Sequence, residues 1–333
     1  MTTVLARVVG GGRSGWDPLS TPALRRRPAT AAPVFAVLTA LVVGVAAAPA
    51  SASAAKARTW LAEINYYRTG AGLKPVANNA AWDKGIRNHL KYLQKTSPSL
   101  MTGQYASAHT ENPKSPYYTK SGAQEGSRSD LLLGGGVGTP LPDIDNWLTA
   151  PFHAIGMLRT GLTKVAFASG FAGAGLDVLG GLTFGNPPAK PIMFPGRNVT
   201  TNLTAYSGNE LPNPLQSCHY PKAAKSKPVG LPIIVLLPKT PAKKLTATLA
   251  FPHGGSEGTT GRTLCLVDQF TYHSTDTVYG PTGLEILKGD HAVLLFPSGH
   301  PEGRNLQGHH PQRPQDHLHL ALQSQAVAAR APT

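Results

Sequence analysis

The chain has 333 residues, which is enough for two domains of about 100–200 residues each. Charged residues make up 14% of it, and 36 glycines and 30 prolines indicate short regular elements joined by many turns, which excludes a large helical body. The formal net charge is +14, so we expect an anionic cell-wall polymer or lipid as partner, while the lack of a basic stripe interleaved with aromatic residues argues against nucleic acid.

The first predicted element is a secretory signal peptide over residues 1–54, with an N-terminal extension over residues 1–20. Arg25–Arg27 precede an apolar run from Val34 to Ala48, and small residues follow up to Ala54. This order of positive, apolar and small residues is typical of an export signal. The apolar run is shorter than the roughly 20 residues of a membrane span, so we expect a secreted, extracellular protein with no stable span after cleavage. An uncleaved membrane anchor is the alternative interpretation.

The part that follows the signal is predicted to begin with a domain over residues 56–185 that mixes helices and strands. Apolar residues recur at helical spacing from Lys56 to Gly70 and again from Asn79 to Leu93. Short apolar segments around Val165 and Val178 indicate buried strands.

A polar, proline-rich stretch over residues 96–129 lies between these helices and strands. A long irregular stretch of this kind is usually functional or disordered. A short helix is predicted next, over Pro142–Thr149, with Asp143 as its N-cap. We expect Pro151 to end this helix, so that His153 turns inward.

Residues 186–298 are predicted as a small all-β domain, because short apolar segments follow one another with glycine and proline between them. Apolar and polar residues alternate most plainly over residues 245–251, and evenly spaced short strands suggest a β-sandwich. Cys218 and Cys265 both lie in this region, and in an oxidising compartment their simplest arrangement is one disulfide. A catalytic thiol is the alternative, but His219 is next to Cys218, and neighbours on a strand point to opposite faces.

The last segment, residues 299–333, breaks the strand pattern. It is biased toward His, Gln and Pro, and it has no β-branched residue before Val327. Histidine-rich tracts can bind metals, which is one interpretation of the tail. Reading the codons of Glu302–His309 one base later, however, allows a set of residues that includes a good strand. We hypothesise that a frameshift near Gly299 replaced the native last strands and left a disordered tail with accidental histidines.

Four segments within residues 60–168 carry a recognisable pattern. They are EINYYRTGAGLKPV followed by a helix with Trp82, then AHTENP, GAQEG and WLTAPFHAIGMLRTGLTKVAFA. In the last segment Trp147 is followed by a small residue, a proline, a histidine, an apolar stretch and a strand. Together these segments resemble a bacterial CAP domain, of the cysteine-rich secretory, antigen 5 and pathogenesis-related family, also called SCP-like.

The resemblance implies an α-β-α sandwich with a cleft that holds two histidines and two acidic residues, sometimes around a divalent metal. His109 matches the first histidine and His153 the second, and Glu125 lies near the family's glutamate. At the other acidic position this chain has Ala150, with Glu111 as a candidate substitute. His109, His153 and Glu125 are therefore candidate ligands of a divalent metal such as zinc, although a firm zinc site needs three or four protein ligands.

Taken without the resemblance, the same histidines have simpler interpretations. His153 would be a helix-end residue that satisfies local carbonyls, and His109 a surface residue of a loop. The sequence shows no nucleophile elbow, no metalloprotease helix motif and no serine paired with a base, so no catalytic residue is assigned.

The predicted fold class is α+β: a CAP-like α-β-α sandwich followed by a small all-β, β-sandwich-like domain. We expect a secreted, non-enzymatic binding or adhesion protein of the cell envelope, with no firm cofactor. One alternative is a metal-dependent hydrolase that uses the His/Glu cleft to activate water. The other is lipid or sterol binding, which is known within the family.

Overall fold

The computed structural model describes residues 2–6, 58–134, 137–197, 199–219, 228–250, 256–258, 264–298 and 318–324. All of these residues belong to one compact unit. The predicted signal peptide lies outside them, apart from β1 (Thr2–Ala6). No helix in the described ranges is long and apolar enough to cross a membrane.

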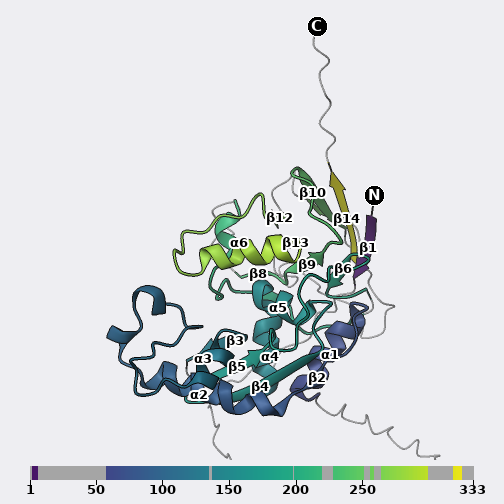
Figure 1. Cartoon of the computed structure of the whole chain (residues 1–333). Coiled ribbons are helices and arrows are strands. Elements are labelled where there is room, and N and C mark those ends of the chain that lie inside the picture. The colour runs from purple at the N-terminus through teal and green to yellow at the C-terminus, as the bar shows by residue number, and fades with distance from the viewer. Residues whose placement is uncertain are drawn as a thin grey trace, which may run out of the picture. The chain divides into compact units, whose positions relative to one another are not determined.

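A four-stranded sheet is the middle layer of the first region, residues 58–185 (Figure 1). Alternate residues of one of its strands point to opposite faces. Val165 and Phe167 pack with apolar residues of three helices on one face, whereas Ala166 and Ala168 pack with helix α2 on the other. These three layers confirm the predicted α-β-α sandwich. The strands, in spatial order, are β2 (Ala77–Asn78), β4 (Lys164–Gly170), β5 (Gly173–Asp177) and β3 (Ser129–Leu133).

Helices cover both faces of this sheet. The first face is covered by α1 (Trp60–Gly70), α4 (Pro140–Thr149) and α5 (Pro151–Leu158). The second face is covered by α2 (Asp83–Lys95), and α3 (Lys120–Gly126) packs against α2. The described residues also form short 3-10 helices, which are η1 (Ala80–Trp82), η2 (Pro98–Leu100), η3 (Gly103–Tyr105) and η4 (Pro214–Ser217).

The stretch over residues 96–129 contains a regular helix, α3, that the sequence pattern does not indicate. Thr119 caps it, because its Oγ1 accepts a hydrogen bond from the Gly122 N–H at 2.9 Å. A Cβ atom at Gly126 would collide with the ring of His89 on α2. Glycine is therefore needed for the close approach of the two helices, and it removes the apolar pattern by which a helix is recognised.

The helix boundary at Pro151 differs from the prediction. α4 begins two residues earlier than expected, with Thr139 as its N-cap, and Asp143 lies in its first turn, where Oδ2 accepts from the Gly138 N–H at 2.9 Å. Pro151 ends α4 and is also the first residue of α5, a position where a missing N–H is tolerated. His153 is therefore in the first turn of a new helix.

The second region, residues 186–324, is rich in strands, as predicted for residues 186–298, and a strand lies in the alternating segment over residues 245–251, as expected. One sheet has the order β12 (Leu264–Val267), β13 (Ala292–Pro297), β9 (Ile233–Leu236) and β6 (Ile192–Phe194). The other has the order β1, β14 (Leu318–Ser324), β10 (Leu245–Ala250) and β11 (Ser256–Gly258). A two-stranded ribbon joins β7 (Ala205–Tyr206) to β8 (Val229–Gly230).

One helix, α6 (Gly280–Gly289), corrects the all-β expectation for the second region. Its glycines and Pro281 conceal the helical spacing of the buried Leu287 and the partly buried Leu284. Tertiary packing of Leu287 overrides the weak local signal.

The sheet that contains β9 is buried on both of its faces. Ile233 and Val235 pack with Leu249 of β10 in the neighbouring sheet. Ile234 points the other way and joins the apolar cluster that includes Trp147 of α4. The first and second regions therefore share one hydrophobic core.

The predicted disulfide between Cys218 and Cys265 is present. It joins the end of η4 to β12 across a sequence separation of 47 residues. Closing a loop of this length restricts the unfolded chain, which stabilises the fold by about 4 kcal/mol in the chain-entropy account.

The C-terminal segment differs from the expected disordered tail in one place. Leu318–Ser324 form β14, which lies between β1 and β10 and pairs antiparallel with both. The other residues of the segment 299–333 lie outside the described residues, and so does the site of the hypothetical frameshift, which stays a prediction.

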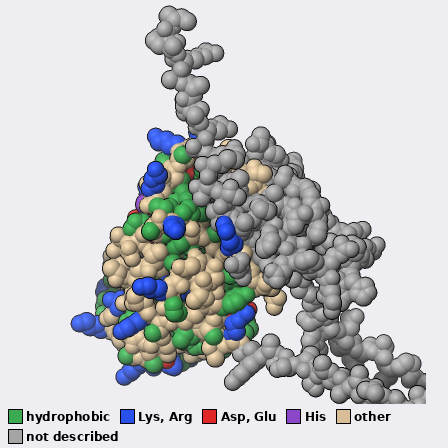
Figure 2. Space-filling model, turned by 90° about the vertical axis from the view of Figure 1, so that its right-hand side faces the viewer, with side chains coloured by type: hydrophobic (Ala, Val, Ile, Leu, Met, Phe, Trp, Pro, Cys, Tyr) green, Lys and Arg blue, Asp and Glu red, His purple; other side chains and the backbone are tan. Residues whose placement is uncertain are grey.

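Basic side chains are spread over the surface that the structure describes. On the face drawn in Figure 2, Lys and Arg are scattered among apolar and neutral side chains, and few acidic side chains appear. The distribution follows the formal net charge of +14. A surface of this kind attracts anions within about 8 Å at physiological salt.

Arg68 in α1 is buried and binds backbone carbonyls. Its Nε donates to Lys74 O at 3.0 Å, its Nη1 to Met157 O at 2.6 Å and Arg159 O at 3.1 Å, and its Nη2 to Leu162 O at 3.1 Å. Carbonyls at the end of a helix lack intrahelical donors, so Arg68 satisfies the end of α5. Burial lowers the pKa of Arg68 to about 10, which leaves it charged at neutral pH.

Arg68→Met is predicted to lower the free energy of unfolding by about 2–4 kcal/mol, because it leaves these buried carbonyls without a donor. Urea unfolding followed by circular dichroism measures the change. Arg87→Met is the matched control: Arg87 is 49% exposed and lies 3.6 Å from Asp83, so we expect a loss below about 0.5 kcal/mol. Equal losses in the two variants would contradict the role given to Arg68.

Candidate functional site

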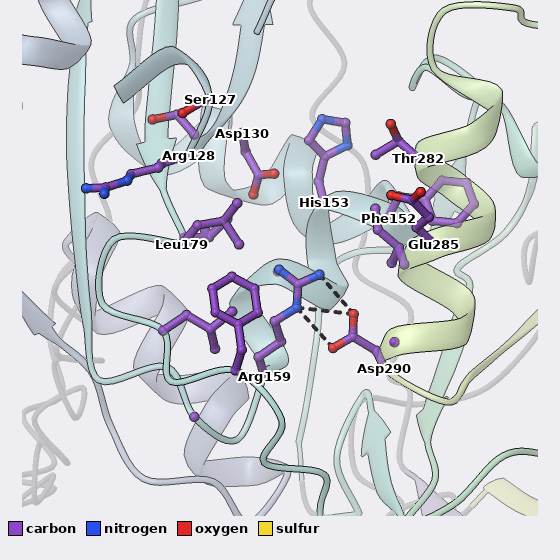
Figure 3. A pocket seen from close by; sticks show the side chains of 18 of the residues that line it. Ser127, Arg128, Asp130, Phe152, His153, Arg159, Leu179, Thr282, Glu285 and Asp290 are labelled. Atoms are coloured by element: carbon purple, nitrogen blue, oxygen red, sulfur yellow. Dashed lines mark hydrogen bonds and ion pairs between the residues drawn. The ribbon is translucent and has the colours of Figure 1, made fainter. Parts of the chain in front are cut away.

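A cavity of about 860 Å³ lies where the first region meets the second (Figure 3). It is bordered by α5, by the segment 178–188 and by α6, so its walls come from both regions. Apolar side chains form part of the lining, among them Phe152, Val178, Leu179, Leu182 and Phe184. Titratable side chains form another part, among them His109, Asp130, His153, Arg159, Glu285 and Asp290.

His153 is paired with a carboxylate from the second region. Its Nδ1 lies 3.0 Å from Oε2 of Glu210, and the two side chains are 17% and 1% exposed. Burial opposes a charge on the ring, but the hydrogen bond to Glu210 and the charges of Asp130 and Glu210 outweigh it and raise the pKa of His153. The charged ring is therefore favoured at the edge of the cavity.

Asp130 of β3 is the second carboxyl group near His153, and Figure 3 shows the two side chains at the same cavity. Among the described residues, Asp130 Oδ2 is buried without a hydrogen-bond partner. Burial raises the pKa of Asp130 to about 7, although the charges of His153 and Arg159 favour its ionised form. This carboxyl group therefore changes its proton occupancy near neutral pH.

His109 reaches the same cavity from the AHTENP segment. Its Nδ1 donates to Gly126 O at 3.0 Å, and its ring meets the ring of Tyr279 edge-on, with 6.2 Å between centroids. Tyr279 also accepts a hydrogen bond at its hydroxyl from the Ala108 N–H at 2.7 Å. Burial lowers the pKa of His109 to about 4, although the Gly126 carbonyl favours the charged ring. His109 is therefore neutral at neutral pH.

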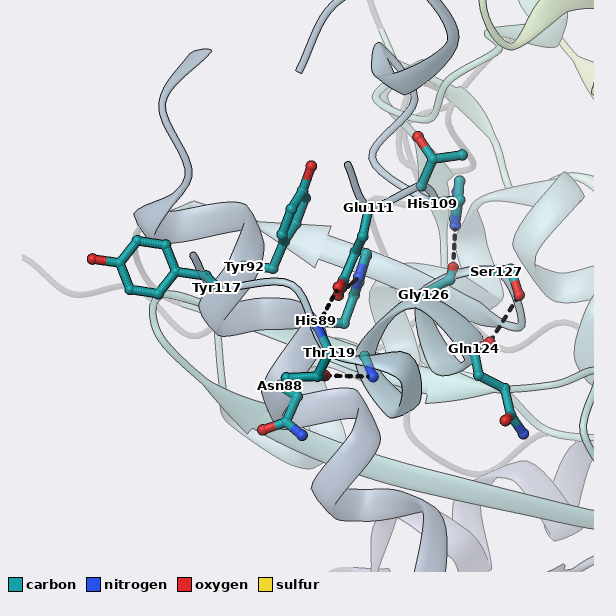
Figure 4. A network of polar contacts seen from close by, with 12 residues as sticks. Asn88, His89, Tyr92, His109, Glu111, Tyr117, Thr119, Gln124, Gly126 and Ser127 are labelled. Atoms are coloured by element: carbon teal, nitrogen blue, oxygen red, sulfur yellow. Dashed lines mark hydrogen bonds and ion pairs between the residues drawn. The ribbon is translucent and has the colours of Figure 1, made fainter. Parts of the chain in front are cut away.

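Glu111 is not part of the cavity lining but lies in a buried pair with His89 of α2 (Figure 4). His89 Nδ1 is 2.9 Å from Glu111 Oε1, and Glu111 Oε2 accepts from the Thr119 N–H at 3.1 Å. His89 Nε2 donates to Ala108 O at 2.7 Å. These bonds tie the AHTENP segment to α2 and to the start of α3, so Glu111 and His89 support the loop that carries His109.

Glu125 is turned toward the sheet. It lies beside Asp177 of β5, and both side chains are buried. Burial raises the pKa of Glu125 to about 8, and the nearby charge of Asp177 adds to this effect. Asp177 Oδ1 accepts from the N–H groups of Leu179 and Gly180 at 2.9 and 2.6 Å, which fixes the turn that leads into the cavity wall.

The predicted metal ligands are not brought together as one group. His109 and His153 line the cavity, whereas Glu125 does not. Within the described ranges, no group of three or more His, Cys, Asp or Glu side chains could hold a metal ion. These side chains therefore do not fit the divalent metal that the resemblance implies, because a firm zinc site needs three or four protein ligands.

The lining of the cavity also contains an ion pair. Arg159, just after α5, binds Asp290, just after α6, through three hydrogen bonds: Nε to Oδ1 at 3.0 Å, Nε to Oδ2 at 3.1 Å and Nη2 to Oδ2 at 2.9 Å. Figure 3 shows this two-pronged contact. It links the two helices that face each other across the cavity.

Sequence reasoning misses Glu210, Asp130 and Tyr279. No local motif surrounds Glu210, and its partner His153 lies 57 residues away in the sequence. Asp130 reads as an ordinary polar residue next to an apolar run. The pairing of β3 with β5 brings Asp130 to the cavity, and the packing of α6 brings Tyr279 there. Glu210 does not line the cavity but reaches His153 from the loop between β7 and η4.

No curated protein and no solved structure matches the chain. A family model does match part of it, from α1 through β5. The match includes both candidate histidines and leaves Glu210, Tyr279 and α6 outside. Residues 61–182 match the model of the cysteine-rich secretory protein family, CAP.

Proposed function

We propose that the chain is an exported CAP-type protein that binds an anionic, partly apolar molecule of the cell envelope in the junction cavity, without changing it chemically. The observation that carries this proposal is the cavity of about 860 Å³ itself, with His153 and an apolar wall in one lining. Pockets that combine an apolar wall with a few polar groups are the usual form of a small-molecule site.

Exposed apolar side chains at the cavity support a partly apolar ligand. Phe184 is 72% exposed and Leu211 is 62% exposed, and both line the cavity. They are the most exposed large apolar side chains among the described residues. Exposed apolar groups gathered at a hollow typically mark a binding surface.

Charge supports an anionic ligand. The full chain carries a formal net charge of +14, and residues 1–54 contain five arginines and one aspartate, so the processed chain keeps about +10. This charge draws anions toward the surface from a distance. At the cavity, the environment of His153 favours its charged ring. Arg159 adds a second cation, although Asp290 neutralises much of its charge.

Two features support the proposed export: the residue pattern before Ala54 and the disulfide. The Arg25–Arg27 cluster, the apolar run and the small residues follow the order of a signal peptide. A disulfide between Cys218 and Cys265 persists outside the reducing cytosol. Both features support a site of action in the envelope or the extracellular space.

We predict that decyl phosphate, used as a monomeric anionic amphiphile, binds the protein and that Phe184→Ser weakens the binding about tenfold, because apolar contact area is lost. Isothermal titration calorimetry measures both affinities. Phe270→Ser is the matched control, since Phe270 is 41% exposed and is not part of the lining. We expect this control to bind as the unchanged protein does.

Two comparisons make this experiment decisive. Decyl maltoside has the same tail and no charge, so equally tight binding of it would contradict the anionic part of the proposal. Release of inorganic phosphate from decyl phosphate would contradict a purely binding role. Absence of any binding by the unchanged protein would contradict the proposal as a whole.

Export predicts a processed chain outside the cell. When the full chain is produced in a secreting bacterial host, the extracellular form should begin after Ala54, as shown by N-terminal sequencing. Leu41→Arg places a charge in the apolar run and should abolish export. Leu19→Arg lies in the upstream extension and should leave export unchanged. Retention of residues 34–48 in the extracellular form, or equal export of both variants, would refute the signal.

A further inference from the structure

Glu210 lies on the loop between β7 and η4 of the second region, yet its carboxylate is buried against α5 of the first region. Its side chain is 1% exposed. Oε2 lies 3.0 Å from His153 Nδ1 and accepts from the Phe152 N–H at 3.1 Å, while Oε1 accepts from the Tyr206 hydroxyl at 3.3 Å. These donors hold the carboxylate at the first turn of α5.

The first region does not supply this carboxylate itself. The residue three positions after Trp147 is Ala150, which is 2% exposed and forms the extended junction between α4 and α5. Its side chain carries no polar group that could receive the His153 Nδ1–H. Glu210 occupies the space next to that ring from a segment outside the CAP match.

We propose that Glu210 is the positioning residue of His153, so that the second region completes the binding site of the CAP region. An ionised carboxylate can only accept hydrogen bonds, so Nδ1 of His153 must carry the proton. Since the surroundings of His153 favour the charged ring, Nε2 carries a proton as well and can donate it to an anion in the cavity. The inference rests on the proposed function only in naming the cavity as the place where His153 acts.

A purely structural role for Glu210 makes a different prediction. If Glu210 only capped α5 through the Phe152 N–H, the state of the imidazole ring would not depend on it. Glu210→Gln keeps the size of the side chain and an acceptor for the helix but removes the charge. The charge of the His153 ring therefore separates positioning from capping.

Nitrogen NMR of the imidazole rings in the full chain reads the protonation of both ring nitrogens directly. Because the contact with Glu210 raises the pKa of His153 above its ordinary 6.5, we expect a ring at pH 6.5 that is mostly charged, with protons at both Nδ1 and Nε2. In Glu210→Gln the negative charge is gone, so we expect the ring to become mostly neutral at this pH and the affinity for decyl phosphate to fall about tenfold. Glu285→Gln is the matched control, because Glu285 lines the same cavity and is exposed. It should leave the His153 signals unchanged.

The two readouts separate this inference from the proposed function. A His153 ring in the unchanged protein that carries no proton at Nδ1 overturns the inference even if Glu210→Gln fails to fold. His153 signals that are identical in the unchanged protein and Glu210→Gln also overturn it, whether or not decyl phosphate binds. If the expected loss of charge on His153 is seen in Glu210→Gln but decyl phosphate does not bind the unchanged protein, the positioning role stands and the proposed ligand is wrong.

Discussion

Helix α5 is held at both ends by buried charges of the sign that its dipole favours. The carboxylate of Glu210 lies at its N-terminus, where the Phe152 N–H has no helical partner. The guanidinium of Arg68 lies at its C-terminus and binds the carbonyls of Met157 and Arg159. Negative charge at the start of a helix and positive charge at its end are each stabilising. Since α5 has only eight residues, these distant side chains supply what local capping does not.

The position of α5 determines the cavity, because the helix contributes to its lining at both ends. His153 lies in the first turn, and Arg159 follows the last. Phe152 packs edge-on against Tyr272 of the second region, with 5.9 Å between ring centroids. The shared hydrophobic core and the Arg159–Asp290 pair then fix the second region against the first. The junction between the two regions is therefore a part of the site and not only a connection.

Much of the architecture can be predicted from the sequence, because it follows local periodicity. The helices that contain Trp60 and Ile86, the alternation in β10 and the disulfide all follow from spacing and composition. α3 and α6 could not be predicted, since glycines that permit close packing also remove the helical pattern.

The residues of the site also fall into two groups, those that a sequence motif identifies and those that only tertiary packing brings together. His109 and His153 are found by motif, and both do line the cavity. Glu111 and Glu125 are equally visible in their motifs, but tertiary packing directs them to His89 and to the neighbourhood of Asp177. Glu210 has no motif, because its role depends on a loop from another region meeting the start of α5. Sequence pattern thus locates the histidines, whereas packing selects their carboxylate partners.

Burial determines the charges of His109 and Asp130 in the cavity, whereas carboxylate neighbours determine the charge of His153. The charge of the outer surface follows the amino-acid composition. The basic surface attracts an anion to the cavity mouth, but the cavity also contains carboxyl groups that would repel it. Asp130 can lose its own share of this repulsion by protonation, because burial raises its pKa to about 7. An anion placed beside His153 would favour the protonated form of Asp130 further. Binding of the proposed ligand would therefore be coupled to proton uptake near neutral pH, which makes a lining that contains carboxyl groups compatible with an anionic ligand.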